Sequence, residues 1–168
     1  NSHFSSRNIN ADGSWKDLTI KKNTSPDISP TAGQMGRMVG LAQASKVYRN
    51  SKVLPKKSKF SEKGNEIVYG TIGDASTSEG IFWEAVNAAG VLQVPMVLSV
   101  WDDGYGISVP KSYQTTKESI SEVLKGFQRT EEKDGFEIIK VKAWDYEALH
   151  RAYAKAEKVA RHEHVPVL

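Results

Sequence analysis

The sequence contains no cysteine, which excludes disulfide bonds and metal sites built on thiolates. No run of apolar residues approaches the length needed to cross a membrane, and the first residues do not resemble a signal peptide. The lack of cysteine fits a reducing compartment. We therefore expect a cytoplasmic protein that does not contact a membrane.

The chain has 168 residues, enough for one domain with a substantial core but too few to expect two. Its charge of +3 and its 26% of charged residues are ordinary for a globular protein. The last residues, 165–168, stop within an apolar run. We expect a piece of a longer chain, so the absence of targeting signals carries little weight.

A basic segment interrupts this ordinary composition. Seven basic residues lie between Lys46 and Lys63. The simplest interpretation is a solvated loop; the alternative is a patch that binds anions or nucleic acid. Because only Tyr48 and Phe60 offer stacking surface there, we expect no nucleic-acid partner.

The pattern of the remaining chain predicts alternating strands and helices. Short apolar runs at 67–72, 96–101, 136–141 and 165–168 indicate strands, the first of them buried on both faces. Residues 1–28 are expected to form an irregular lead-in, and 29–168 an α/β domain that is incomplete at its C-terminus. The predicted fold is a parallel sheet with helices on both faces.

Four helices are predicted between or before these strands. One opens after Ser29 with helically spaced apolar residues, and another follows residue 80. A third is expected to begin at the capping box formed by Thr115 and Glu118. The fourth is expected to be capped by Asp145.

Two acidic turns follow the first two predicted strands. Residues 73–80 read GDASTSEG, and residues 102–105 read DDGY. Because parallel strands end at one edge of a sheet, the two turns are expected to meet where α/β proteins bind phosphorylated ligands. Asp74 and Asp103 could hold Mg²⁺, while the backbone N–H groups of Ala75 and Ser76 approach a diphosphate.

These segments resemble a known family. The stretch from GDASTSEG to DDGYGIS at 102–108 is similar to the thiamine-diphosphate motif in the alpha subunit of 2-oxo acid dehydrogenases of the pyruvate and branched-chain type. That motif runs Gly-Asp-Gly, a gap of a little under thirty residues, then Asn-Asn; here 26 residues separate the two elements. The segment SPTAGQ at 29–34 is similar to the family segment that contacts the aminopyrimidine of the cofactor.

The resemblance implies an oxidoreductase that binds thiamine diphosphate in a thiamine-diphosphate-binding fold and decarboxylates a 2-oxo acid, passing the acyl group to a lipoyl group. It implies Mg²⁺ held by Asp74, Asp103 and the carbonyl of Tyr105. It also implies that two groups of residues contact the cofactor itself. These are Ala75 and Ser76 at the diphosphate, with Ser29 and Thr31 at the aminopyrimidine.

The implied partners are a beta subunit or a fused beta-type region, the lipoyl domain of the acyltransferase component, and further copies in an oligomer. The family's activating glutamate belongs to the beta part, so no catalytic residue is assigned to this chain. We expect His150, His162 and His164 to lie on the surface.

Three departures from the family pattern leave alternatives open. Ala75 replaces a glycine and would be strained in a left-handed conformation. Asp103 replaces an asparagine and adds negative charge. Trp101 stands near the position of a phosphate-binding arginine in branched-chain members.

These departures favour, as an alternative, a non-catalytic assembly domain that has lost the cofactor. A transketolase-like enzyme remains a further possibility, although the sequence GYGISVP at 104–110 disfavours it. A magnesium-dependent phosphoryl-transfer enzyme that uses Asp74 and Asp103 is also open, but it would require a nucleophile or a phosphate-cradling lysine, and no P-loop is present.

Overall fold

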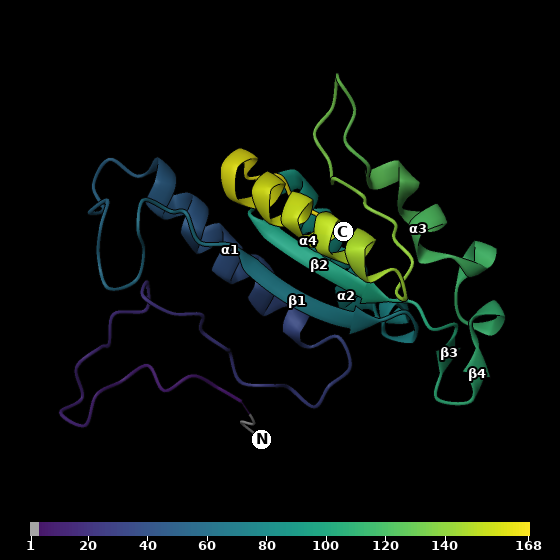
Figure 1. The fold of residues 1–168 in the computed structure, drawn as a ribbon, viewed down its shortest axis with the longest axis horizontal. Coiled ribbons are helices and arrows are strands. Elements are labelled where there is room, and N and C mark those ends of the chain that lie inside the picture. The colour runs from purple at the N-terminus through teal and green to yellow at the C-terminus, as the bar shows by residue number, and fades with distance from the viewer. Residues whose placement is uncertain (1–3) are drawn as a thin grey trace.

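The computed structural model describes residues 4–168. Its central pair of strands, β1 (Val68–Gly73) and β2 (Met96–Trp101), is parallel, with Val68 opposite Met96 and Gly73 opposite Trp101. A helix crosses between the two strands (Figure 1). Both strands were predicted within one residue of their bounds, because short β-branched runs flanked by Gly and Pro are distinctive.

Two further segments extend the sheet beyond β2. Val167 forms parallel bridges with both Val97 and Glu137, so the order is β1, β2, the segment around Val167, and the segment around Glu137. The amide of Leu98 donates to the carbonyl of Val167 (2.9 Å), and the amide of Glu137 donates to Pro166 (2.9 Å). The predicted third and fourth strands are therefore present only as short paired segments.

Helices cover both faces of this sheet, as the sequence predicted. Met96 and Leu98 face the core shared with α1 (Gln34–Asn50) and α2 (Gly80–Leu92). Val97 points the other way and packs in a second cluster with α4 (Tyr146–Lys158) and the turn that follows it. Figure 1 shows α4 in front of the sheet and α1 behind it.

β1 is less buried than expected. Tyr69 is 52% exposed, and in β1 only Ile72 is fully buried. The prediction of a strand buried on both faces is wrong because α4 packs on Val97 and Val167 and leaves part of β1 uncovered on that face.

The start of α1 differs from the prediction, whereas the start of α4 agrees with it. α1 begins at Gln34 rather than directly after Ser29, since residues 29–33 form turns; before Gln34 the described chain has no helix and only one isolated bridge, Ile9 with Trp15. The predicted cap of α4 is confirmed. The carboxylate of Asp145 accepts from the amide of Ala148 at 2.9 Å.

The predicted capping box does not form. Lys117 and Glu118 have left-handed backbone conformations, with φ of 60° and 53°, so the chain turns instead of opening a helix. The helix there, α3 (Ile120–Val123), is a single turn between two 3₁₀ turns. Ile120, the first residue of α3, is nonetheless buried.

The basic segment is used largely within the fold. The Lys46 ammonium donates to the carbonyls of Leu92 (2.5 Å) and Gln93 (3.2 Å), at the end of α2. The Lys56 ammonium donates to the carbonyls of Arg49 (2.8 Å) and Ser51 (3.1 Å), at the end of α1. Cations at helix C-termini satisfy carbonyls that have no partner within the helix.

Arg49 also donates to backbone carbonyls, one in the basic loop and one in the turn that follows α4. Its guanidinium donates to the carbonyls of Gly64 (3.1 Å) and Arg161 (2.7 Å). Gly64 has φ of +64°, and a Cβ there would lie 2.4 Å from the backbone of both Ser45 and Arg49. Only glycine therefore allows the basic loop to pack this closely on α1.

His164 lies at the same junction and is 7% exposed, so the expectation of a surface position is wrong for it. Its Nε2 is 3.2 Å from the carbonyl of Gly64. Burial lowers the pKa of His164, and the nearby Arg49 and Lys46 lower it further. His150 and His162 are exposed, as expected.

None of the helices within residues 4–168 is both long and apolar enough to span a membrane.

Candidate functional site

The two acidic turns meet at the carboxyl end of the sheet. The amide of Asp74, directly after β1, donates to the carbonyl of Trp101, the last residue of β2, at 3.1 Å. The register of the strands places Gly73 opposite Trp101, so the chain leaves both strands at the same level. This confirms the predicted meeting of the turns and fixes it by a main-chain hydrogen bond.

Asp74 is buried at this edge, with 4% of its surface exposed. It precedes the 3₁₀ turn η1 (Ala75–Ser78), and its carbonyl accepts from the amide (3.1 Å) and the hydroxyl (2.5 Å) of Thr77. Burial raises the pKa of the Asp74 carboxyl, and the negative charges of Asp102 and Asp103 raise it further. The ionised form of a buried carboxyl that also feels two negative charges is one that a cation would stabilise.

Ala75 is not strained. It lies in the right-handed turn η1 and is absent from the described residues with positive φ, so the expected cost of replacing glycine does not arise. Space for its methyl group comes from Gly106. A Cβ on Gly106 would lie 2.7 Å from the Cβ of Ala75 and 2.5 Å from the Gln114 amide nitrogen.

This contact places a small hairpin against the first acidic turn. The hairpin pairs β3 (Tyr105–Gly106) with β4 (Val109–Pro110). Asp103 lies at its entrance and accepts from the amide of Tyr105 at 3.1 Å. Asp74, Asp103 and Tyr105 are therefore brought to one edge, while Ala75 and Ser76 follow Asp74 in η1.

The assignment of these residues as metal ligands remains a prediction. Within residues 4–168, no group of three or more His, Cys, Asp or Glu side chains is placed to hold a metal ion. The predicted set differs in kind, because it contains two carboxylates and one backbone carbonyl.

Sequence reasoning missed one residue at this edge. The ammonium of Lys111 lies 3.2 Å from Oδ1 of Asp102 and forms an ion pair with it. The two residues are separated by the hairpin, so no local spacing rule indicates the pair. Knowledge that DDGY opens a hairpin would have been the only available signal.

Ser29 and Thr31 are exposed in the turn before α1. The side-chain amide of Gln34, at the start of α1, donates to the carbonyl of Thr71 at 3.0 Å. Thr71 lies three residues before Asp74, so the turn before α1, like the acidic edge, lies near the carboxyl end of β1. Contact of Ser29 and Thr31 with a cofactor stays a prediction.

Trp101 is 62% exposed and points to the face of the sheet that carries α4. Its indole N–H donates to the Ser99 hydroxyl (3.1 Å), which in turn lies 2.7 Å from the hydroxyl of Tyr153. The ring of Tyr153 packs edge-on against Tyr69 at 6.0 Å, and burial raises the pKa of Tyr69 to about 12. The Trp101 side chain therefore belongs to an aromatic cluster on the sheet, while its carbonyl accepts from Asp74 at the acidic edge.

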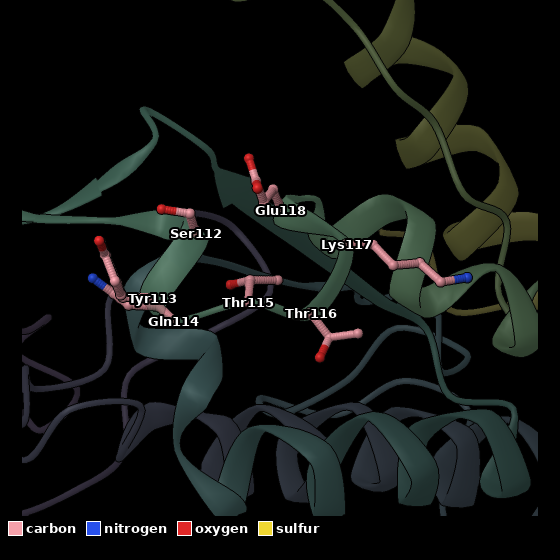
Figure 2. Close-up of a pocket in the computed structure, with 7 residues that line it drawn as sticks. All are labelled: Ser112, Tyr113, Gln114, Thr115, Thr116, Lys117 and Glu118. Carbon is pink, nitrogen blue, oxygen red and sulfur yellow. The ribbon is translucent and has the colours of Figure 1, made fainter.

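A surface hollow lies beside the hairpin, where the capping box was predicted. Residues 112–118 line it, and their side chains point in different directions (Figure 2). Binding sites for small molecules bring a few polar groups together toward one point. The hollow includes the left-handed residue Lys117 and offers no such convergence.

Comparison with known proteins decides the family. The model for "Dehydrogenase E1 component" matches residues 5–168. The chain belongs to the dehydrogenase E1 component family. The predicted resemblance to the alpha component of the thiamine-diphosphate-dependent 2-oxo acid dehydrogenases is thereby confirmed.

Curated relatives agree with this assignment. The chain is 30% identical over 166 residues to the mitochondrial 2-oxoisovalerate dehydrogenase subunit alpha of Dictyostelium discoideum, covering 99% of this chain and 30% of that one. It is 27% identical over 140 residues to the 2-oxoisovalerate dehydrogenase subunit alpha of Bacillus subtilis, covering 83% and 36%. It is 30% identical over 95 residues to the pyruvate dehydrogenase E1 component subunit alpha of Staphylococcus epidermidis, covering 54% and 25%.

The matched region is therefore only a part of these relatives. Alignments cover from 19% to 36% of the relatives' lengths.

Proposed function

We propose that this chain is the thiamine-diphosphate- and magnesium-binding alpha portion of a 2-oxo acid dehydrogenase. The reaction of the whole enzyme would be oxidative decarboxylation of a 2-oxo acid with transfer of the acyl group to a lipoyl group. The observation that carries the proposal is the main-chain bond from Asp74 to Trp101, which holds the two halves of the motif at one sheet edge.

The residues at this edge fit the cofactor chemically. Asp74 and Asp103 offer carboxylate oxygens and Tyr105 a carbonyl, the ligand types that Mg²⁺ prefers alongside phosphate oxygens and water. Burial of Asp74 near two other acidic residues leaves negative charge that a divalent cation would offset. The N–H groups of Ala75 and Ser76 lie in the turn before α2, whose N-terminus favours an anion.

Each part of the chain would then have a separate task. Asp74, Asp103 and Tyr105 would hold the metal, Ala75 and Ser76 would bind the diphosphate, and backbone groups of Ser29 and Thr31 would orient the aminopyrimidine. Thiamine diphosphate, when bound, supplies the carbon nucleophile for the decarboxylation. The proton transfers would depend on the beta-type partner, which completes the site; the lipoyl domain would receive the acyl group in an oligomeric assembly.

The test is thermal unfolding of the chain together with its beta-type partner, with thiamine diphosphate in the presence and absence of Mg²⁺. A ligand at a hundred times its dissociation constant should stabilise the folded state by roughly 2.7 kcal/mol. We expect a magnesium-dependent rise in Tm that Asp74→Ala abolishes. Asp134→Ala, which alters an exposed acidic residue in a loop outside the proposed site, serves as the control and should keep the rise.

Absence of any shift in the complete assembly would contradict the proposal. It would favour the alternative, a non-catalytic assembly domain with the same fold.

A further inference from the structure

The acidic edge carries more negative charge than the motif it resembles. Asp102 and Asp103 occupy the two positions at which the family pattern has Asn-Asn, and both repel the carboxylate of Asp74. A site that binds an anionic diphosphate through one divalent cation does not need three carboxylates. At least one of them is therefore expected to be offset from within the protein.

The ammonium of Lys111 offsets the charge of the Asp102 carboxylate. Its ammonium lies 3.2 Å from Oδ1 and 3.5 Å from Oδ2 of Asp102, so it contacts both oxygens. The two side chains are 35% and 32% exposed, so water only partly screens the pair. Among the described residues, the ion pairs at this edge include Asp102 but not Asp103.

The backbone of Lys111 is also fixed. Its amide donates to the carbonyl of Gly104 at 2.9 Å, and its own carbonyl accepts from the amides of Gln114 (3.0 Å) and Thr115 (2.8 Å). The side chain therefore starts from a fixed position at the base of the hairpin, which lowers the conformational entropy lost when it pairs with Asp102.

The two adjacent aspartates consequently have different surroundings. Asp102 is held by a cation that returns across the hairpin, whereas Asp103 accepts only from the amide of Tyr105 at 3.1 Å among the hydrogen bonds of the described chain. A carboxylate that is already paired with an ammonium is a poorer metal ligand than one that is not.

We propose that Lys111 is the positioning residue of this edge: its ammonium pairs with Asp102, so that Asp74 and Asp103 are the two carboxylates available to a metal ion. This inference rests on the proposed function and adds a regulator of metal affinity to it. Lys111 lowers the affinity of the edge for a divalent cation, because its positive charge offsets the negative charge of Asp102.

The test is calorimetric titration of Mn²⁺ into the complete enzyme, with its beta-type partner, at saturating thiamine diphosphate. Lys111→Gln frees Asp102 and should tighten Mn²⁺ binding on the order of tenfold, as expected for one added charge close to a cation. Lys111→Arg keeps the pair and should leave the affinity near that of the unaltered enzyme. Combining Lys111→Gln with Asp102→Asn removes both charges and should also restore it.

A merely structural lysine would give a different pattern, since losing it would weaken metal binding in Lys111→Gln and in the double variant alike. That result, or an unchanged affinity in Lys111→Gln, would overturn the inference while leaving the proposed function intact. Failure of the unaltered enzyme to bind Mn²⁺ with thiamine diphosphate would overturn both.

Discussion

Two groups of charged residues lie at opposite ends of the parallel strands. At the amino ends, basic side chains donate to backbone carbonyls near the ends of α1, α2 and the turn after α4; these are Lys46, Arg49 and Lys56. At the carboxyl ends, Asp74, Asp102 and Asp103 lie near one another, and Lys111 pairs with Asp102. The basic groups satisfy polar atoms of the fold itself. Burial and the charges of Asp102 and Asp103 raise the pKa of the Asp74 carboxyl, so the charged form of Asp74 is disfavoured in the unliganded fold and a cation there would be favourable.

This contrast shows why net charge is a poor guide to function in this chain. The basic segment is the most strongly charged part of the sequence, yet most of the hydrogen bonds made by its side chains go to carbonyls at or near helix ends. The acidic turns are short and unremarkable in composition, but they lie where the parallel strands end and where ligands bind in α/β folds. Whether a charge already has a partner in the fold is more informative than its sign.

The largest expected effect concerns the basic end. Gly64→Ala would force a side chain into a left-handed conformation and against backbone atoms of Ser45 and Arg49. We expect a loss of at least about 3 kcal/mol in the free energy of unfolding, measured by urea denaturation. Gly36→Ala is the matched control, since nothing lies within 4 Å of its added methyl and helix propensity predicts a gain of up to about 1 kcal/mol.

Arg49→Met tests whether the basic residues are structural. It would leave the carbonyls of Gly64 and Arg161 without their donor, at a cost of about 2 kcal/mol by the same denaturation measurement. Lys52→Met alters an exposed lysine of the same segment and should change stability by less than about 0.5 kcal/mol. If Arg49→Met and Lys52→Met changed the free energy of unfolding equally, the structural role assigned to the basic residues would be wrong.

Asp74→Asn tests the acidic end and should act in the opposite direction. The folded chain raises the pKa of this carboxyl, so ionised Asp74 costs stability at neutral pH. We expect the unliganded variant to melt at a higher temperature than the unaltered chain at pH 7. The advantage should shrink as the pH falls and the Asp74 carboxyl becomes protonated; a lower Tm at pH 7 would contradict the proposed repulsion.

We expect the smallest effect on stability from His164, whose protonation makes the stability of the basic end depend on pH. Its pKa is lower in the folded chain than the ordinary 6.5, so the unfolded chain takes up the proton first. Stability is therefore lost as the pH falls from about 6.5 toward the lowered pKa, and it is unaffected above that window. His164→Asn suits the left-handed backbone and can donate to Gly64, so it should flatten this part of a Tm-against-pH curve.

The sequence predicted the elements whose signals are local. β1, β2, α2 and the Asp145 cap each follow from a short apolar run, a periodic face or one side-chain contact. It also predicted the meeting of the two acidic turns, because parallel strands necessarily end at one edge. These features depend little on the rest of the chain.

The remaining features depend on contacts between distant segments. Thr115 and Glu118 satisfy the capping-box pattern, but left-handed turns at Lys117 and Glu118 redirect the chain. Burial of His164 requires Gly64, a hundred residues earlier. The ion pair of Lys111 depends on the path of the hairpin, and the exposure of Tyr69 depends on where α4 lies, so neither could be read from composition or periodicity.

The bond from the Asp74 amide to the Trp101 carbonyl has a consequence for how this edge can evolve. It is made by main-chain atoms, which every non-proline residue supplies at the first position and every residue at the second. Side chains on either turn can therefore be exchanged while the geometry that brings the turns together persists. Descendants of such a chain could shift from metal binding to another use by changing a few side chains, with the same backbone still holding them in place.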